Sequence, residues 1–189
     1  MIKDYKDVLD FWFDPKNIPR QFTEEPEFDE LIRSEFLSTW RAASEGLLFH
    51  WRETCEGRLA EIIVLDQFSR NLWRNNILTY TQDKMAIALA QELIKLSEYR
   101  DLPTDWKKFA LLPFMHSESL SLHKWAAKYF DELAKEGDEM TKVFEQMHLD
   151  VLKRFGRYPY QNEDLGREST AEELEFLKSK RGKIYSIED

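Results

Sequence analysis

Apolar residues recur at three- and four-residue spacing along most of the chain, the pattern of helices that bury one face. These stripes predict helices at roughly residues 5–13, 27–45, 58–73, 79–96, 104–112, 117–135, 139–155 and 171–179. Strand-like alternation is confined to short ambiguous segments such as EIIVLD. The sequence therefore predicts an all-α fold of eight or nine antiparallel helices with short connections, a helical-hairpin array.

The segment 58–73 predicts the most deeply buried helix. Because a helix turns 100° per residue, Asp66 and Arg70 fall one turn apart, inside an apolar arc that also contains Leu59. Val64 and Phe68 belong to a second apolar arc on the opposite side. A helix that is apolar on two sides packs between neighbours, and a charge buried there requires a partner. We expect Asp66 and Arg70 to be buried and paired.

Three features shape the second half of the predicted array. Pro113 disfavours helical geometry at Leu112, so we expect the helix that begins near Thr104 to be interrupted there. Thr170 and Glu173 form a capping-box pattern before the last helix. The helix 139–155 is expected to bury a stripe that consists of Met140, Val143, Phe144, Met147 and Val151.

Length and composition fit one globular domain. The chain has 189 residues, of which 42% are hydrophobic and 33% charged, enough for a core and too apolar for a disordered chain. We expect a single helical domain over residues 1–189, with about 180–189 as a flexible tail. The formal charge of −9 argues against a general nucleic-acid binder, because such a protein needs a basic surface.

The chain contains a single cysteine, Cys55, which cannot form an internal disulfide and fits a reducing compartment. No apolar run approaches the ~18 residues of a membrane span. The charged N-terminus also lacks the pattern of a signal peptide. We therefore expect a cytoplasmic protein without a membrane partner.

Polar residues are concentrated in three stretches, residues 65–74, 112–119 and 148–167. Guanidinium groups bind phosphate or carboxylate through paired hydrogen bonds, and Gly156 and Gly166 would let backbone N–H groups approach such an anion. The arginines in these stretches outnumber the acidic residues, so we expect some of the arginines to bind an anion that is not part of the chain. The residues compared are Arg70, Arg74, Arg154, Arg157 and Arg167 against Asp66, Glu118, Glu163 and Asp164.

Two histidines add candidate acid–base chemistry. Histidine titrates near neutral pH, so His116 and His148 are candidates for proton transfer, with Asp66 orienting a histidine or Arg70. The alternative is that each histidine is a hydrogen-bonded core or interface residue. No metal site is predicted at His116, Glu118 and His148, because nearby arginines would repel a cation. Phosphate-loop and dinucleotide fingerprints are absent from the sequence, so we expect no cofactor.

Five motifs occur in order between Val8 and Leu177: LDFWF, LDQFSRNLWR, LLPFMHSES, RFGRYPYQNEDLGREST and EELEFL. Together they resemble the bacterial proteins grouped as domain of unknown function 924. This resemblance implies an all-helical, tetratricopeptide-like fold without an assigned activity. We place Glu118 and Asn162 with the five arginines as ligand-binding candidates. The positions on which the family pattern falls are Asp66, Gln67, Arg70, Asn71, Arg74, His116, Glu118, His148, Arg154, Gly156, Arg157, Pro159, Asn162, Gly166 and Arg167.

The chain departs from the family pattern in two places. Pro159-Tyr160-Gln161-Asn162 stands where the pattern commonly has proline-histidine-arginine-asparagine. His123 stands where a glutamine often follows the histidine-serine-glutamate motif. A mechanism that relies on the loop histidine and arginine therefore has less support in this chain.

Three hypotheses about function remain open, and the sequence assigns no reaction. The first is a pocket for an anionic small molecule, with proton transfer if the protein is an enzyme. The second is a tetratricopeptide-like adaptor that binds a peptide or a protein through an exposed aromatic groove, with Trp51, Trp73 and Trp106 as candidates. The third is a polar core that only specifies packing, in which Asp66→Ala or Arg154→Ala would destabilise the fold by several kcal/mol.

Overall fold

The computed structural model describes residues 1–179, and over that range the protein is helical and contains no strand. The helices are α1 (Tyr5–Trp12), α2 (Pro26–Ser44), α3 (Cys55–Ile63), α4 (Ser69–Leu72), α5 (Asp83–Leu93), α6 (Thr104–Met115), α7 (Leu120–Lys135), α8 (Glu139–Phe155) and α9 (Ala171–Lys178). Because α3 and α4 are parts of one helix, the described residues form eight helices. The predicted all-α fold is confirmed. The expected tail, 180–189, lies outside the described residues.

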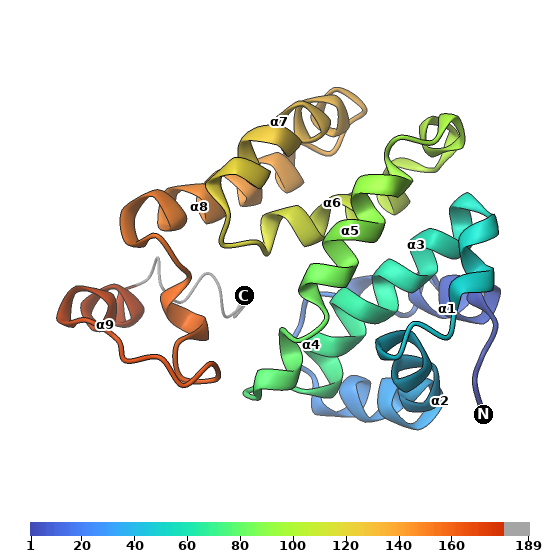
Figure 1. Ribbon diagram of the computed structural model, residues 1–189, viewed down its shortest axis with the longest axis horizontal. Coiled ribbons are helices and arrows are strands. Elements are labelled where there is room, and N and C mark those ends of the chain that lie inside the picture. Colours follow the sequence, from blue (N-terminus) through green and yellow to red (C-terminus); the bar gives the residue numbers. More distant parts are fainter. Residues whose placement is uncertain (180–189) are drawn as a thin grey trace.

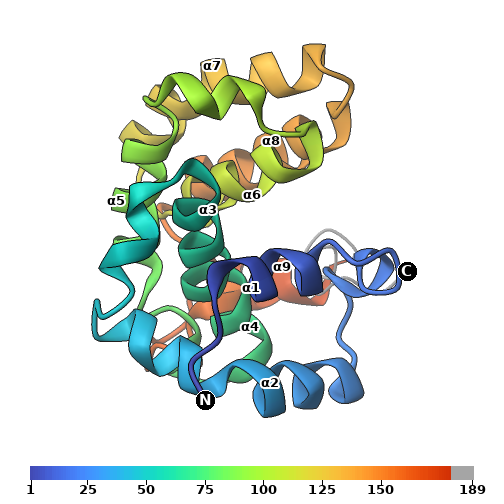
Figure 2. The same ribbon diagram turned by 90° about the vertical axis from the view of Figure 1, so that its right-hand side faces the viewer.

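From the central helix onward, helices that follow one another in the chain pack side by side, whereas α1 packs against α3 and α2 against α4. α3 contacts α1 and α5, α5 contacts α6, and α6, α7 and α8 continue the series. α6 lies between the part of the molecule formed by α1–α5 and the α7–α8 hairpin (Figures 1 and 2). The loop before α9 returns toward α4 (Figure 1). The C-terminal loop and the end of the central helix therefore lie on the same side of the molecule.

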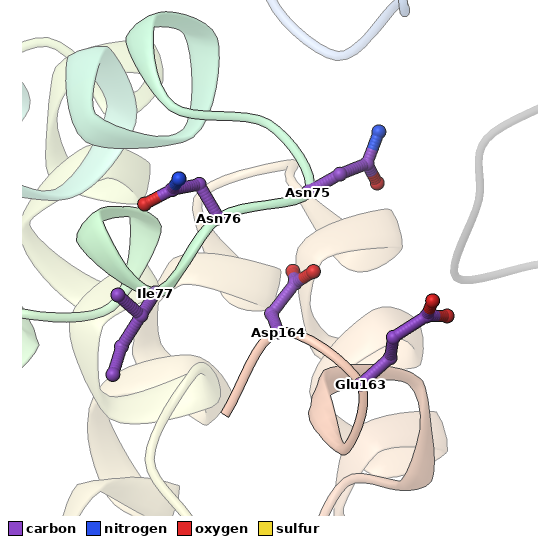
Figure 3. Close-up of a pocket in the computed structure, with 5 residues that line it drawn as sticks. All are labelled: Asn75, Asn76, Ile77, Glu163 and Asp164. Atoms are coloured by element: carbon purple, nitrogen blue, oxygen red, sulfur yellow. The ribbon is translucent and has the colours of Figure 1, made fainter. Parts of the chain in front are cut away.

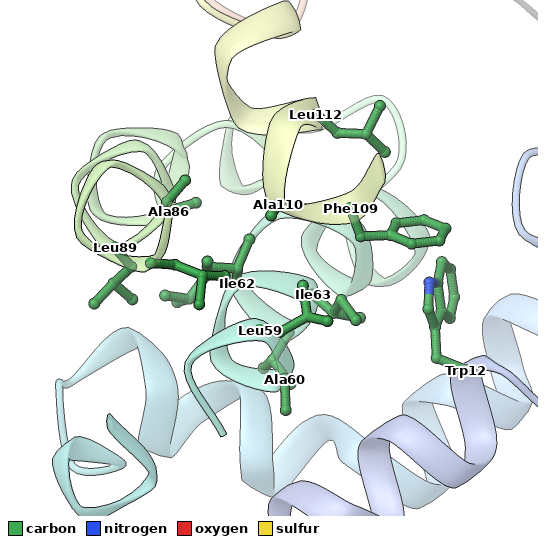
Figure 4. Close-up of a cluster of buried hydrophobic side chains, with 14 of the residues drawn as sticks. Trp12, Leu59, Ala60, Ile62, Ile63, Ala86, Leu89, Phe109, Ala110 and Leu112 are labelled. Carbon is green, nitrogen blue, oxygen red and sulfur yellow. The ribbon is translucent and has the colours of Figure 1, made fainter. Parts of the chain in front are cut away.

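Residues 55–72 form the central helix of the core, as the two apolar arcs predict. Thr54 caps its start, because the Thr54 side chain accepts a hydrogen bond from Gly57 N. Leu59, Ile62 and Phe68 are fully buried. Figure 4 shows this helix packed against residues of α1, α5 and α6. The Phe68 ring contacts the rings of Phe11, Trp12 and Phe36.

A wide π turn at Val64–Phe68 separates α3 from α4. Such a turn inserts one extra residue into a helix and occurs frequently at functional sites. Two carbonyl oxygens inside it accept hydrogen bonds from side chains one turn later. Ser69 Oγ donates to Leu65 O at 2.5 Å, and Arg70 Nη1 donates to Asp66 O at 2.8 Å. No glycine or proline marks this turn in the sequence.

The predicted interruption at Pro113 is wrong, because α6 continues through it to Met115. Leu112, Pro113 and Phe114 are all buried in the core. Proline in a helix removes one hydrogen bond and crowds the preceding turn. Burial of this apolar segment outweighs that local preference.

The stripe predicted for α8 is also wrong for its first half. Met140, Val143 and Phe144 are exposed, whereas Thr141 and Glu145 on another side are buried. A buried carboxylate requires a hydrogen-bond partner, and Glu145 finds one in His123 of α7. This polar contact places the side of α8 that carries Glu145 against α7, which differs from the side that the apolar pattern predicted.

Phe68→Ala is expected to lower the free energy of unfolding by about 3–5 kcal/mol, because it leaves a cavity among three aromatic rings. Chemical denaturation followed by circular dichroism measures the change. The control is Phe49→Ala, which removes an aromatic ring that is 67% exposed and should change stability by less than about 0.5 kcal/mol. Equal losses in both variants would contradict the central position of the 55–72 helix.

Candidate functional site

Asp66 is a buried carboxylate at the centre of the fold, with its side chain 1% exposed. Its Oδ1 lies 2.8 Å from His116 Nδ1 and 3.0 Å from Arg70 Nη1, and Oδ2 accepts from Gln67 Nε2 at 2.5 Å. Burial on its own would raise the pKa of this carboxyl. Arg70 and His116 outweigh that effect and lower the pKa of Asp66 to about 2. Asp66 is therefore ionised at neutral pH.

Arg70 connects Asp66 to Asp83 of α5. Its Nη1 and Nη2 donate to Oδ1 and Oδ2 of Asp83 at 3.0 and 3.2 Å. Burial raises the pKa of Asp83, Arg70 opposes this, and the nearby charge of Asp66 adds to it. The predicted pairing of Asp66 with Arg70 is confirmed. One guanidinium group shared by two carboxylates leaves no surplus positive charge here.

His116 follows the last residue of α6 and points its Nδ1 at Asp66. Its side chain is 16% exposed, and Nε2 has no hydrogen-bond partner among residues 1–179. Because the partner of Nδ1 is an ionised carboxylate, Nδ1 carries a hydrogen, and Nε2 carries the lone pair whenever the ring is neutral. A histidine oriented in this way by a carboxylate is suited to act as a general base.

His148 of α8 lies beside His116, with 6.4 Å between the two ring centroids. Its Nδ1 donates to Phe144 O at 2.8 Å. Burial lowers the pKa of His148 to about 3 despite this hydrogen bond, and nearby His116, His123 and Arg70 act in the same direction as burial. His148 is therefore neutral at pH 7. The structure brings together the three predicted catalytic candidates, Asp66, His116 and His148.

The five arginines do not converge on one pocket. Each already contacts a carboxylate of this chain, and most of these acceptors lie outside the three polar stretches of the sequence. The excess of arginines within those stretches therefore gives no support for an external anion, because carboxylates from other segments balance it. The ion pairs are Arg70 with Asp66 and Asp83, Arg74 with Asp29, Arg154 with Glu172, Arg157 with Glu173, and Arg167 with Glu118.

Glu118 forms a second polar group with the loop that follows α8. Its Oε1 accepts from Tyr158 N at 2.7 Å, and its two oxygens bind Arg167 at 2.7 and 2.9 Å. Asn162 is buried in this loop and donates to Ser169 Oγ at 3.0 Å and to Glu173 Oε2 at 3.3 Å. These contacts fix the path of the loop.

The two loop glycines do not present their N–H groups to an anion. Gly156 N donates to Leu152 O, and Gly166 N donates to Glu163 O. Both glycines have positive φ, at 72° and 64°, a conformation that glycine adopts without steric cost. They therefore end α8 and turn the loop, which differs from the anion-binding role expected for them.

A pocket of 380 Å³ lies where the loop meets the turn after α4. Figure 3 shows its lining on two facing segments, Asn75–Ile77 and Glu163–Asp164. Asp164 Oδ2 also accepts a hydrogen bond from Tyr80 Oη at 3.1 Å. Burial and the charge of Asp164 raise the pKa of Tyr80, so the phenol keeps its hydrogen. The predicted catalytic residues are not among the described residues that line this pocket.

Two other classes of site were searched for in the described part of the chain. Residues 1–179 contain no group of three or more His, Cys, Asp or Glu side chains arranged to hold a metal ion. Within the same range, no helix combines the length and the apolar character needed to cross a membrane.

A comparison with known protein families finds a match over the part of the chain in which the motifs occur. A family model described as bacterial protein of unknown function (DUF924) matches residues 8–181. The chain belongs to this family. A solved structure of a protein of unknown function from Agrobacterium tumefaciens is 31% identical to this DUF924 chain, with a TM-score of 0.83. The match covers 92% of this chain and 96% of that one. No curated protein matches the chain.

His123 of this DUF924 protein has polar contacts that its sequence context did not indicate. It is 1% exposed, and its Nδ1 lies 2.6 Å from Glu145 Oε1. Its Nε2 lies 2.8 Å from Ser117 O and 3.1 Å from Tyr158 Oη. The one sequence signal was the departure from the family pattern at this position.

Asp66→Ala is expected to lower the free energy of unfolding by about 3–5 kcal/mol, because it leaves buried partners without their counter-charge. Arg154→Ala, in contrast, breaks a pair whose side chains are 53% and 64% exposed, and should cost less than about 1 kcal/mol. The expectation that both variants are severely destabilised is thus revised for Arg154. Urea denaturation of both variants measures the difference. If both variants lost a similar free energy of unfolding, burial would not account for a difference in stability between the two ion pairs.

Stability is expected to fall with pH below neutrality, in part because of His148. The unfolded chain protonates this histidine near pH 6.5, whereas the folded pKa is about 3. A lowered folded pKa gives stability above the unfolded pKa that is lost as pH falls toward the folded pKa. His148→Gln should therefore show a smaller drop in melting temperature between pH 7 and pH 5. His50→Gln, an exposed site, is the control, and equal drops would contradict the assignment.

Proposed function

We propose that this DUF924 protein binds a small polar molecule beside His116 and that His116 transfers a proton to or from it. The observation that supports this is the hydrogen bond between the buried, ionised Asp66 and His116 Nδ1 at 2.8 Å. An ionised carboxylate at Nδ1 stabilises the imidazolium that forms when Nε2 accepts a proton. Asp66 is the orienting group, His116 is the acid–base group, and His148 is the neutral neighbour.

The contrast between two histidines supports a catalytic role for His116 over a purely structural one. His123 is fully buried and uses both ring nitrogens in hydrogen bonds within the chain. His116 uses only Nδ1 among the described residues and remains partly exposed. A histidine kept only for packing is expected to satisfy both nitrogens. His116 retains a nitrogen that can meet a ligand.

The ligand we propose carries an exchangeable proton and little net charge. The anionic ligand expected from the sequence has less support, because Arg70 is already shared between Asp66 and Asp83. The other four arginines are each paired with a carboxylate elsewhere in the chain. A phosphate would have to displace these carboxylates from their guanidinium partners.

A tetratricopeptide-like adaptor is the second candidate function, and the three tryptophans expected to line its groove pack within the fold. Trp51 is 2% exposed and belongs to the core. Trp106 stacks on Phe13 at 4.8 Å, and Trp73 packs against Trp40 at 5.2 Å. The three tryptophans therefore serve intramolecular packing instead of forming an aromatic surface for a peptide.

A cytoplasmic location forms part of the proposal. Cys55 is a buried free thiol, and burial raises its pKa to about 11. Such a thiol is unreactive as a nucleophile, and the sequence contains no second cysteine with which it could form a disulfide. It supports a reducing environment.

The proposal is tested by screening polar metabolites, including carboxylates and phosphates, for thermal stabilisation of three proteins. These are the wild type, His116→Gln and His50→Gln. A compound that binds only the folded state raises the melting temperature, and at about 100 times its Kd the gain is about 2.7 kcal/mol. We expect at least one compound to stabilise the wild type and His50→Gln but not His116→Gln.

Two outcomes would count against the proposed site. A compound that stabilises all three proteins equally binds away from His116. If no compound stabilises any protein and His116→Gln simply melts at a lower temperature, the Asp66–His116 pair serves packing alone. If phosphates are the preferred ligands, the site at His116 is supported, but its ligand is anionic instead of nearly neutral.

A further inference from the structure

The two backbone carbonyl groups on either side of His116 are both held by side chains from other parts of the fold. Met115 O accepts from Tyr158 Oη at 2.7 Å. Ser117 O is bound by His123 Nε2 at 2.8 Å. His116 N itself donates to Leu112 O, in the last turn of α6, at 3.0 Å. The backbone that carries His116 is therefore fixed immediately before and immediately after that residue.

The acceptor in each of these contacts determines which atom carries the hydrogen. A carbonyl oxygen only accepts, so Tyr158 donates its hydroxyl hydrogen to Met115 O and His123 donates its Nε2 hydrogen to Ser117 O. Tyr158 Oη also lies 3.1 Å from His123 Nε2, where the phenol oxygen accepts. The two donors thus form one connected group around the backbone of His116.

Glu145 completes this group from α8. Its Oε1 lies 2.6 Å from His123 Nδ1, so the carboxyl fixes the plane of the imidazole ring that reaches Ser117. Its Oε2 is buried and has no hydrogen-bond partner within residues 1–179. Burying half of a carboxyl without a partner is unfavourable. This free-energy cost is explained if Glu145 is needed at this position to orient His123.

We propose that His123 and Tyr158 are positioning residues that align His116 with Asp66, and that Glu145 orients His123 for this role. The inference rests on the proposed function of His116 as the acid–base group. The turn after α6 would otherwise let the His116 ring move relative to Asp66, which is held in the central helix. Alignment of the Asp66–His116 pair thus depends on α7, α8 and the loop that follows α8.

The experiment measures the Nδ1 hydrogen of His116 by nitrogen-15 NMR on the full chain, without any ligand. In the wild type His116 Nδ1 donates this hydrogen to Asp66 in a hydrogen bond, so the Nδ1–H tautomer dominates and exchange with solvent is slow. His123→Leu removes the donor to Ser117 O. We expect the hydrogen to exchange about tenfold faster, the factor that corresponds to about 1.4 kcal/mol of lost hydrogen bonding.

Conservative variants separate alignment from general loosening of the fold. His123→Gln keeps an N–H donor near the position of Nε2 and should restore slow exchange. Tyr158→Phe removes the donor to Met115 O and should give the same acceleration as His123→Leu. Phe130→Ala, a buried position on α7, is the control that lowers stability without removing either donor and should leave exchange slow.

The proposal is overturned if His123→Leu or Tyr158→Phe folds and keeps the wild-type exchange rate. It is also overturned if His123→Gln or Phe130→Ala accelerates exchange as much as His123→Leu. Should His123→Leu fail to fold, Tyr158→Phe and His123→Gln still decide the question. Because the readout needs no ligand, failure of the metabolite screen and failure of this test are independent results.

Discussion

The negative charge of Asp66 in the core is the constraint on which the rest of this structure depends. An ionised carboxylate without water requires compensation from hydrogen bonds and opposite charge. Gln67 and Arg70 supply part of it from the same helix, and His116 supplies the rest from the end of α6. Arg70 in turn requires Asp83 of α5. The packing of three helices is therefore tied to one charge.

The helices were predictable from the sequence, because the spacing of apolar residues reports which local segments can bury one side. The same pattern failed where tertiary polar contacts decide the outcome. On α8 the contact between Glu145 and His123 turns Met140 and Phe144 to solvent. At Pro113 the surrounding core keeps α6 helical. Both errors arise because a single-helix pattern contains no information about the neighbouring helix.

The candidate site was predictable only where its members share a helix. The i, i+4 spacing of Asp66 and Arg70 predicted their pairing, because it places both on one side of a helix. The contact with His116, fifty positions away, follows from the fold alone. The partners of the other arginines were not predicted for the same reason, since acceptors such as Asp29 and Glu173 lie outside the three polar stretches.

The π turn gives the central helix a phase that ordinary α geometry would not produce. One extra residue within 64–68 rotates all that follows by about 100° relative to α3. In this phase Arg70 reaches Asp83 while Asn71 reaches Asp29 on the first turns of α2. A deletion of a single residue there would preserve a helix of nearly the same length and composition. It would nevertheless disconnect both ends of the site, because Arg70 and Asn71 would no longer face Asp83 and Asp29.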